Sequence, residues 1–457
     1  MQFIINLIQP ELDTMAMAQQ LLFNYSLGKK TLMTNVYRLE PATLLRIFGN
    51  SLESRVDNIH HFNFEKKSYY EDITKVADEL VSLFSTACKN RVDLNNKNIL
   101  SLSGGHDSRA VAAALDKNSI PFIAATFLDP NKKYSTDIEV AEKLAWKLNI
   151  ECERYYLSPP SGNDLDTLLR IKNGLNYLAM AYILQFFDNL SGKHGSRVTY
   201  ITGDGGDKVL VSLDPAQKMN SLDDLVDYTI SMNHVFSISD VAAITNIPEN
   251  EIIDGIKNNL STYPEKALSQ KYVHFLIYER AFKWFFEGED RNRFYFWSVT
   301  PFNSIPFFDY AMKCPDKIKS YDTLYQAFMS RLSPSIATVD YVGRPRVNQS
   351  TLSRHMYDTQ LYLKRRLIKS SLFPLYTPFT GPSYNRKSNT IKCLQQQIDN
   401  CDIISRHMSP FHLARVINNS SKYYKTTLNN LFTITSFIEK LFCNTRTISK
   451  YHGDYFT

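Results

Sequence analysis

Between residues 97 and 202, short apolar segments alternate with longer segments that carry apolar residues at helical spacing. The short segments have the length and composition of buried strands; they are KNILSLS, PFIAATF, ECERYYL and RVTYIT. Three longer segments separate them. The first is DSRAVAAALDKN, the second is a helix that begins near residue 136, and the third is the apolar segment 173–190, which we interpret as a buried helix. This alternation predicts an α/β fold with a mostly parallel, doubly wound sheet and crossover helices.

The chain has 457 residues, and single hydrophobic cores stop growing near about 250–300 residues. We therefore expect three parts: a linker-like segment over 1–68, an α/β domain over 69–345 and a basic, mainly helical region over 346–457. A more polar helical insertion is expected at about 213–275. Residues 361–457 carry 14 Lys or Arg and 4 Asp or Glu. A solvated basic face is the simplest interpretation, and contact with an acidic peptide, a nucleic acid or a membrane surface is the alternative.

Other sequence features exclude several classes of protein. The six cysteines contain no C-x-x-C pair, so neither a zinc ribbon nor a redox motif is expected. The first residues, MQFIINLIQPELD, lack a basic region followed by an apolar one, so we expect no signal peptide. No run approaches the ~18 apolar residues that a membrane helix needs, and the cytoplasm is the default compartment.

The stretch SGGHDS, residues 103–108, stands where the first strand turns into a helix. The adjacent glycines Gly104 and Gly105 let the backbone turn sharply and approach a ligand closely. Backbone N–H groups at a helix N-terminus favour an anion, and the hydroxyls of Ser103 and Ser108 add donors. The carboxylate of Asp107 would repel a phosphate unless Mg²⁺ lay between them. The stretch therefore predicts a pyrophosphate site with a metal ion, and the alternative is a tight turn with an aspartate near a helix start.

This stretch resembles the pyrophosphatase loop (PP-loop) of the N-type ATP pyrophosphatases, whose pattern is Ser-Gly-Gly-x-Asp-Ser. The resemblance implies the adenine nucleotide α-hydrolase-like fold of that group. It also implies that the loop holds the β- and γ-phosphates of ATP, that attack occurs at the α-phosphate, and that AMP and pyrophosphate are products. No Gly-Lys-Ser/Thr follows, so the loop is not of the Walker type.

A second strand is followed by a glycine-rich turn with acids, RVTYITGDGGD at residues 197–207. It resembles the Ser/Thr-Gly-Glu/Asp-Gly-x-Asp motif of the asparagine synthetase superfamily, which includes β-lactam synthetases and lasso-peptide cyclases. By this resemblance Asp207 is the second Mg²⁺ ligand beside Asp107, and Asp204 takes a proton from an attacking amine. The simpler alternative is that these acids cap a helix.

The same resemblance extends over roughly residues 25–345. TLMTNVYRLEPATLLRI resembles the segment between glutaminase and synthetase domains, and EGEDRNRF and IPFFD resemble two later family segments. The implied ATP-binding residues are Leu100, Ser101, Ser103, Gly104, Gly105, Asp107, Ser108, Thr126, Phe127, Thr202 and Gly203.

The chain departs from the family pattern in several places. Residue 2 is Gln2 instead of the cysteine nucleophile of a glutaminase domain, so we expect no internal glutamine hydrolysis. No acid stands between Asp290 and Asp309, where the family usually has a glutamate. Tyr341 occupies the place of a late family lysine.

Two further substitutions alter the charge near the phosphates. Arg344 or Arg346 could replace the charge of the missing lysine, and we choose Arg344 as a catalytic candidate; both could equally be surface arginines. Lys208 stands where an acid usually follows Asp207.

These features predict an AMP-forming amide ligase that adenylates a small-molecule or peptide carboxylate and passes the acyl group to an amine. ATP and Mg²⁺ are the expected cofactors. Nitrogen would come from free ammonia, from a partner glutaminase or from an amine on the acceptor, and a partner protein could supply the peptide. The alternative is a degenerate family member that binds ATP without catalysis. A tRNA-modifying enzyme is a third hypothesis, which the lack of cysteine pairs argues against; we expect no nucleic-acid or membrane partner.

Overall fold

The computed structural model describes residues 10–49, 51, 53–66, 72–130, 135–339, 356, 359 and 388–443. Its main sheet has five strands, all parallel, in the order β5-β4-β3-β6-β7. The strands are β3 (Lys97–Ser101), β4 (Ile123–Leu128), β5 (Cys152–Tyr156), β6 (Val198–Ile201) and β7 (Trp297–Val299). The predicted parallel α/β sheet is thereby confirmed. The chain runs outward from β3 to β5 and returns to pair β6 with β3, so the strand order reverses between β3 and β6, where open α/β sheets bind ligands.

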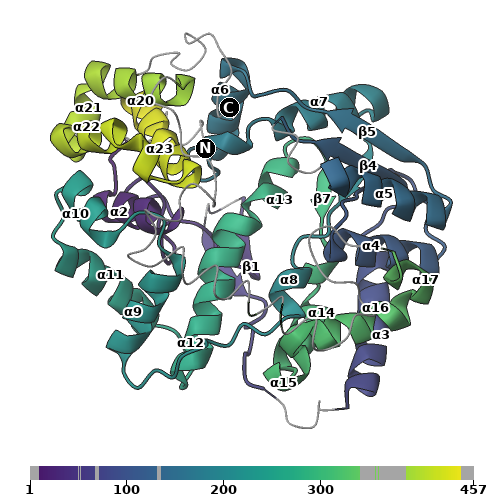
Figure 1. Ribbon diagram of the computed structural model, residues 1–457. Helices are drawn as coiled ribbons and strands as arrows, with labels where there is room; N and C mark the ends of the chain where they lie inside the picture. The colour runs from purple at the N-terminus through teal and green to yellow at the C-terminus, as the bar shows by residue number, and fades with distance from the viewer. Residues whose placement is uncertain are drawn as a thin grey trace.

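Helices cover both faces of this sheet (Figure 1). Successive strand residues point to opposite faces, so Ile99 and Tyr200 enter one core whereas Leu100 and Ile201 enter the other. One face carries α3 (Ile73–Lys89), α4 (His106–Lys117), α5 (Ser135–Leu148), α14 (Ile305–Lys313) and α16 (Thr323–Leu332). The other carries α6 (Gly162–Lys172) and α7 (Ile183–His194).

A helical lobe lies beside the sheet in Figure 1 and joins segments from both ends of the chain. Its helices are α2 (Thr14–Phe23), α9 (Leu222–Asn233), α10 (Ile238–Thr245), α11 (Glu249–Ser261), α12 (Leu268–His274), α20 (Asn389–Asn400), α21 (Asp402–His407), α22 (Pro410–Asn418) and α23 (Lys425–Cys443). Helix α2 packs against α10, α11 and α23. Its apolar residues belong to the same hydrophobic core as α6, α7 and the sheet face that carries Ile99 and Tyr200. The predicted domain boundaries therefore remain predictions, since one core runs through parts of all three ranges.

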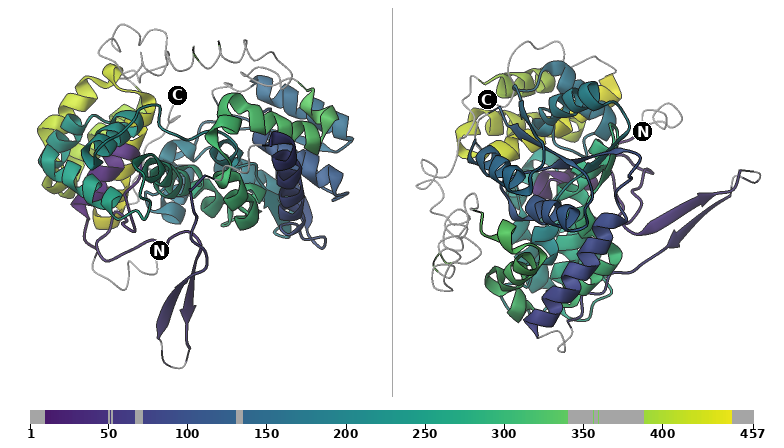
Figure 2. Two further views of the ribbon diagram at one scale, coloured as in Figure 1. Left: turned by 90° about the horizontal axis from the view of Figure 1, so that it is seen from below. Right: turned by 90° about the vertical axis from the view of Figure 1, so that its right-hand side faces the viewer.

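The hairpin of β1 (Thr43–Ile47) and β2 (Ser54–Asn58) projects from the body of the molecule (Figure 2). Its cross-strand pairs put Leu45 opposite Val56 and Arg46 opposite Arg55. One face is consequently apolar and the other charged, and Val56 is 58% exposed.

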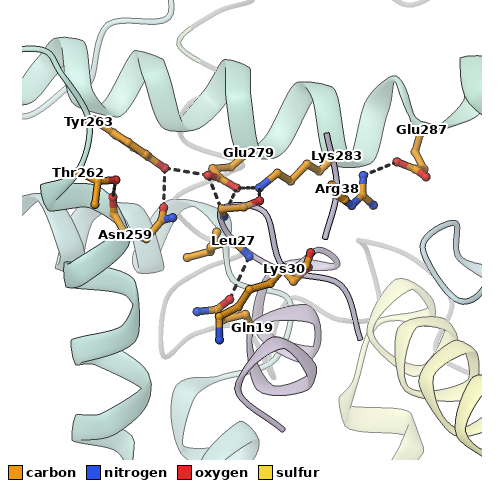
Figure 3. A network of polar contacts seen from close by, with 12 residues as sticks. Gln19, Leu27, Lys30, Arg38, Asn259, Thr262, Tyr263, Glu279, Lys283 and Glu287 are labelled. Atoms are coloured by element: carbon orange, nitrogen blue, oxygen red, sulfur yellow. Dashed lines mark hydrogen bonds and ion pairs between the residues drawn. The ribbon is translucent and has the colours of Figure 1, made fainter. Parts of the chain in front are cut away.

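A buried polar network ties the N-terminal segment to the long helix that follows α12 (Figure 3). This helix, η3 (Phe275–Phe285), is a π-helix. Glu279 accepts hydrogen bonds from the backbone N–H of Gly28 at 3.2 Å and from the hydroxyl of Tyr263 at 3.2 Å. Lys283 donates to both Glu279 and the carbonyl of Gly28. Because buried charges are costly unless paired and hydrogen-bonded, these contacts fix the position of η3 and of α13 (Glu287–Asn292), which follows it.

One local prediction differs from the structure. The segment 173–190 was expected to be one helix, but α7 begins only at Ile183. Asn173 and Gly174 adopt left-handed φ values of 49° and 78°, which end α6 and interrupt the helical path. Helix α12 continues directly into the π-helical stretch η3. Within the described residues no helix is long and apolar enough to cross a membrane.

Candidate active site

The loop between β3 and α4 is shaped by its own serines. The hydroxyl of Ser108 accepts the N–H of Ser103 at 3.0 Å, and the two hydroxyl oxygens lie 3.0 Å apart. The N–H of Gly105 donates to the hydroxyl of Ser103 at 3.2 Å. Gly105 has an ordinary φ of −75°, so its role here is close approach and not a left-handed turn. A Cβ at Gly105 would meet the hydroxyl of Ser103 at 3.2 Å.

Two neighbouring side chains hold this loop from outside. The carboxylate of Asp137, on α5, accepts the N–H of Gly104 at 2.8 Å. The guanidinium of Arg109 is fully buried and donates to the carbonyls of Gly104 at 3.3 Å and Val339 at 2.6 Å. The loop is thus held in one conformation by its own contacts. Because the N–H groups of Ser103, Gly104 and Gly105 are already used, an anion would bind the N–H groups at the first turn of α4 or displace Asp137 from Gly104.

The second glycine-rich turn, residues 202–207, lies directly against the first turn of α4. A Cβ at Gly203 would come within 2.7 Å of the backbone carbon of Asp107, and one at Gly206 within 2.5 Å of its carboxylate. Gly205 has a φ of +117°, which favours glycine. Three glycines therefore allow the turn that follows β6 to reach the turn that follows β3.

Asp107 and Asp207, the predicted metal ligands, are brought together by this packing. The N–H of Asp207, at the start of α8 (Gly206–Val209), donates to the carboxylate of Asp107 at 3.1 Å, and the hydroxyl of Tyr325 donates to it at 2.7 Å. Burial, and next the negative charge of Asp207, raise the pKa of Asp107 to about 7. Two carboxylates that repel each other make a favourable place for a cation.

These two carboxylates fit Mg²⁺, a hard cation that protein sites usually bind through one or two carboxylates, with water and substrate phosphates completing its shell. No group of three or more His, Cys, Asp or Glu side chains that could hold a metal occurs within the described ranges. The chain offers two carboxylates, and a phosphate-bearing substrate would have to supply further oxygen ligands.

Asp204, the predicted base, lies beside the two metal candidates. Its side chain is accessible to solvent, yet burial, and next the charges of Glu289 and Asp107, raise its pKa to about 8. Water therefore reaches the carboxylate from one side, while protein surrounds it elsewhere. Its backbone carbonyl accepts a hydrogen bond from the hydroxyl of Thr300 at 2.6 Å.

The sequence did not single out Glu289 as part of this site. This carboxylate, 5% exposed on α13, accepts hydrogen bonds from the hydroxyls of Thr202 and, at 2.6 Å, of Ser298. Burial raises its pKa as well. The sequence does show three acids in EGEDR after a long aromatic segment, and this density of charge was the available signal.

Arg291 lies two residues further along α13 and is also buried, at 6% exposure. Its guanidinium donates to the side-chain oxygens of Asn176 at 3.3 Å and Asn292 at 3.0 Å. Its positive charge lowers the pKa of Asp204. The acids of this side of the site are therefore balanced in part by one buried cation.

The remaining predicted ATP-binding residues stand at the C-terminal ends of β3 and β4. Leu100 is buried in one core and can offer a ligand only its backbone. Phe127 is half-buried, and the centre of its ring lies 5.0 Å from that of Phe186 in the other core. Thr126 is 4% exposed, and Ser101 is half-buried and shares a hydrogen bond with Tyr200. These residues adjoin the loop, and their contact with a nucleotide stays a prediction.

The other catalytic candidate, Arg344, lies outside the described residues, as do Tyr341 and Arg346. The described chain reaches Val339, whose carbonyl is joined through Arg109 to the loop. The role given to Arg344 therefore stays a prediction.

Comparison with known proteins gives one family match. Residues 79–271 match the family model described as asparagine synthase, and both glycine-rich turns lie within this range. No curated protein matches the chain. Among solved structures, the chain is similar to an NMN synthetase from Francisella tularensis at 16% identity, over 45% of this chain and 92% of that chain. The TM-score of 0.23 is too low for this likeness to bear on function.

Proposed function

We propose that this chain, whose residues 79–271 form an asparagine synthase-type domain, is an ATP-dependent, AMP-forming amide ligase. It adenylates a carboxylate and transfers the acyl group to an amine, without hydrolysing glutamine itself. ATP and Mg²⁺ are required, and the amine belongs to ammonia or to the acceptor molecule.

The approach of Asp207 to Asp107 carries this proposal. The two residues lie a hundred positions apart, at the ends of adjacent parallel strands, and are joined by a 3.1 Å hydrogen bond. Structural carboxylates are normally placed beside cations, because like charges at close range are unfavourable. Two partly desolvated aspartates at the strand-order reversal are therefore better explained by a bound cation and its phosphate ligands than by stability.

Each group has a distinct task in this proposal. The loop positions the pyrophosphate part of ATP through backbone N–H groups at the start of α4. Asp107 and Asp207 hold Mg²⁺, which when bound offsets the negative charge of the phosphates. Asp204 lies next to them, and a carboxylate whose pKa is raised toward neutrality is suited to accept a proton from an attacking amine.

The first test measures pyrophosphate release from Mg·ATP with a panel of carboxylates and short peptides, with and without ammonia. The nucleotide product is identified as AMP or ADP. AMP together with an amine-dependent product would establish an amide ligase and name its substrate class. ADP formation would contradict the proposal.

The second test separates the two half-reactions with the variant Asp204→Asn. We expect it to form the acyl-adenylate and to release pyrophosphate, but to form no amide, because the proton acceptor is lost. If amide formation persisted at the wild-type rate, Asp204 would not be the base.

A degenerate ATP-binding protein is the second candidate, and the ion pair of Lys208 with Asp207 favours it, since the lysine occupies a proposed metal ligand. Tight binding of Mg·ATP with no pyrophosphate from any carboxylate would move this candidate to first place.

A further inference from the structure

Lys208 is held inside the candidate site by two contacts. Its ammonium group forms an ion pair with the carboxylate of Asp207, one residue earlier in α8. The same ammonium lies 4.1 Å from the centre of the Phe285 ring. Only 18% of the lysine side chain is exposed, whereas most surface lysines extend into water. The chain thus keeps one positive charge beside the carboxylate that we assign to the metal.

Lys208 and Mg²⁺ compete for the carboxylate of Asp207. Mg²⁺ needs oxygen ligands at about 2.0–2.1 Å in near-octahedral geometry, and an ammonium at the same carboxylate repels it. The Phe285 ring attracts the ammonium but cannot neutralise it. A half-buried ammonium that loses its carboxylate needs another anion within reach.

The charge balance of the site indicates which anion this is. One divalent cation neutralises Asp107 and Asp207, so the negative charge of the phosphates remains largely uncompensated. Lysine is an effective phosphate ligand because its three N–H groups act as a compact point charge. The positive charge of Lys208 pairs with Asp207 and also lowers the pKa of Asp107, so it acts on both proposed metal ligands.

We propose that Lys208 contacts the pyrophosphate part of ATP, and so supplies the positive charge that Tyr341 cannot. This inference rests on the proposed function. Without a phosphate ligand the lysine is kept in place by Asp207 and Phe285, and it exchanges Asp207 for a phosphate oxygen when Mg²⁺ and the nucleotide bind.

The test measures binding by calorimetry with two probes, Mg²⁺ alone and Mg·pyrophosphate. In Lys208→Met we expect Mg²⁺ alone to bind at least as tightly as in the wild type, because a competitor is removed. Mg·pyrophosphate should bind about tenfold more weakly, because a charge-assisted contact is lost. Lys208→Arg should retain pyrophosphate affinity within about threefold. A merely structural lysine would weaken both probes together.

Lys313 supplies the matched control. Its ammonium pairs with Asp309 at 2.6 Å on α14, and its side chain is 24% exposed, so Lys313→Met removes a similar ion pair that includes none of the residues assigned to the site. It should change neither affinity. Equal binding of Mg·pyrophosphate by Lys208→Met and the wild type would overturn the inference, as would a tenfold loss in Arg344→Gln with none in Lys208→Met.

The outcome also separates this inference from the proposed function. If the wild type binds Mg·ATP and releases pyrophosphate while Lys208→Met binds pyrophosphate normally, only the role of Lys208 fails. If the wild type binds neither Mg·ATP nor Mg·pyrophosphate, the proposed function fails, and the inference fails with it.

Discussion

The two sides of the candidate site are built in different ways. On the loop side, residues 103–108 hold their shape through short-range bonds, such as the 3.0 Å bond between Ser103 and Ser108. On the acid side, Asp204 comes from the turn after β6 and is reached by solvent, whereas Glu289 and Arg291 are buried charges on α13 whose partners include Thr202 and Asn176. The loop side is a local, nearly neutral structure, whereas the acid side is a long-range arrangement of charge. We therefore expect the loop side to respond to steric changes and the acid side to pH and charge.

The largest effect should come from the pair of carboxylates that joins the two sides. Asp107→Asn and Asp207→Asn should each reduce pyrophosphate release by about a thousandfold, which corresponds to about 4 kcal/mol of transition-state stabilisation. Asp107→Asn should leave the thermal midpoint close to the wild type, because it adds no atoms and removes a charge that Asp207 repels. Asp207→Asn should lower the thermal midpoint slightly, because the half-buried Lys208 loses its ion pair. Full turnover in Asp107→Asn would mean that the metal is bound elsewhere.

A steric change tests the contact between the two turns. Gly203→Ala would place a Cβ against the backbone of Asp107 and Ser108, which cannot move aside as a side chain can, and should cost about 3 kcal/mol of folding free energy in denaturant unfolding. Gly192→Ala is the control, since nothing lies within 4 Å of that Cβ; it should stabilise α7 by about 0.5–1 kcal/mol. Equal stability of the two variants would show that the turns are not in such close contact.

A change of hydrogen-bonding capacity tests the acid side. Glu289→Gln keeps the shape but replaces one buried acceptor by a donor, so one hydroxyl of Thr202 or Ser298 loses its partner; the expected cost is about 1–2 kcal/mol. Asp290, the next residue, has a side chain that is 66% exposed, and its buried partner Lys172 also pairs with Glu287, so Asp290→Asn should change stability by less than about 1 kcal/mol. Urea unfolding of both variants at pH 7 makes the comparison, and a larger loss in Asp290→Asn would contradict it.

The pH dependence of folding gives the smallest effect. The folded pKa values of Asp107 and Asp204, about 7 and about 8, lie above the usual value of 3.8. The folded state therefore binds protons more tightly than the unfolded state, and without Mg²⁺ its stability should fall as pH rises from about 4 to about 8. Asp204→Asn removes one of these two contributions. With a chelator present, the free energy of unfolding of this variant should therefore exceed that of the wild type by about 1 kcal/mol at pH 8 and equal it near pH 4. Parallel pH profiles for the two proteins would refute this.

The same comparison explains what the sequence could predict. The parallel sheet follows from the period and length of the apolar segments, and the loop follows from six consecutive residues whose chemistry is local. Asp204 and Asp207 could be proposed as site residues because they belong to a short motif after a strand. Glu289 was not predicted as a site residue. It reaches the site because α13 follows η3 and lies at the ends of β6 and β7, and no local sequence pattern contains that information. The helix expected over 173–190 failed for a related reason, since Asn173 adopts a left-handed conformation that its sequence only permits.

The polar network of Figure 3 had no counterpart in the sequence analysis either. Glu279 and Lys283 are four residues apart and would be interpreted as an exposed helical ion pair. In the structure both are buried, and they hold Gly28, which lies more than two hundred residues earlier. Burial of a charge pair is a property of the whole fold, so a sequence window cannot reveal it.

The joining of chain ends in the helical lobe has a consequence for synthesis on the ribosome. The side-chain amide of Asn430, on α23, donates to the carbonyl of Gln20 at 2.7 Å across a separation of 410 residues. Eight of the ten residues of α2 are buried in the finished protein, so they stay without α23, one of their partners, until that helix is made. At about 5–20 residues per second this delay lasts some tens of seconds. The nascent chain thus leaves the part of α2 that α23 covers exposed until the end of its synthesis, and we expect holding chaperones to bind there before the lobe closes.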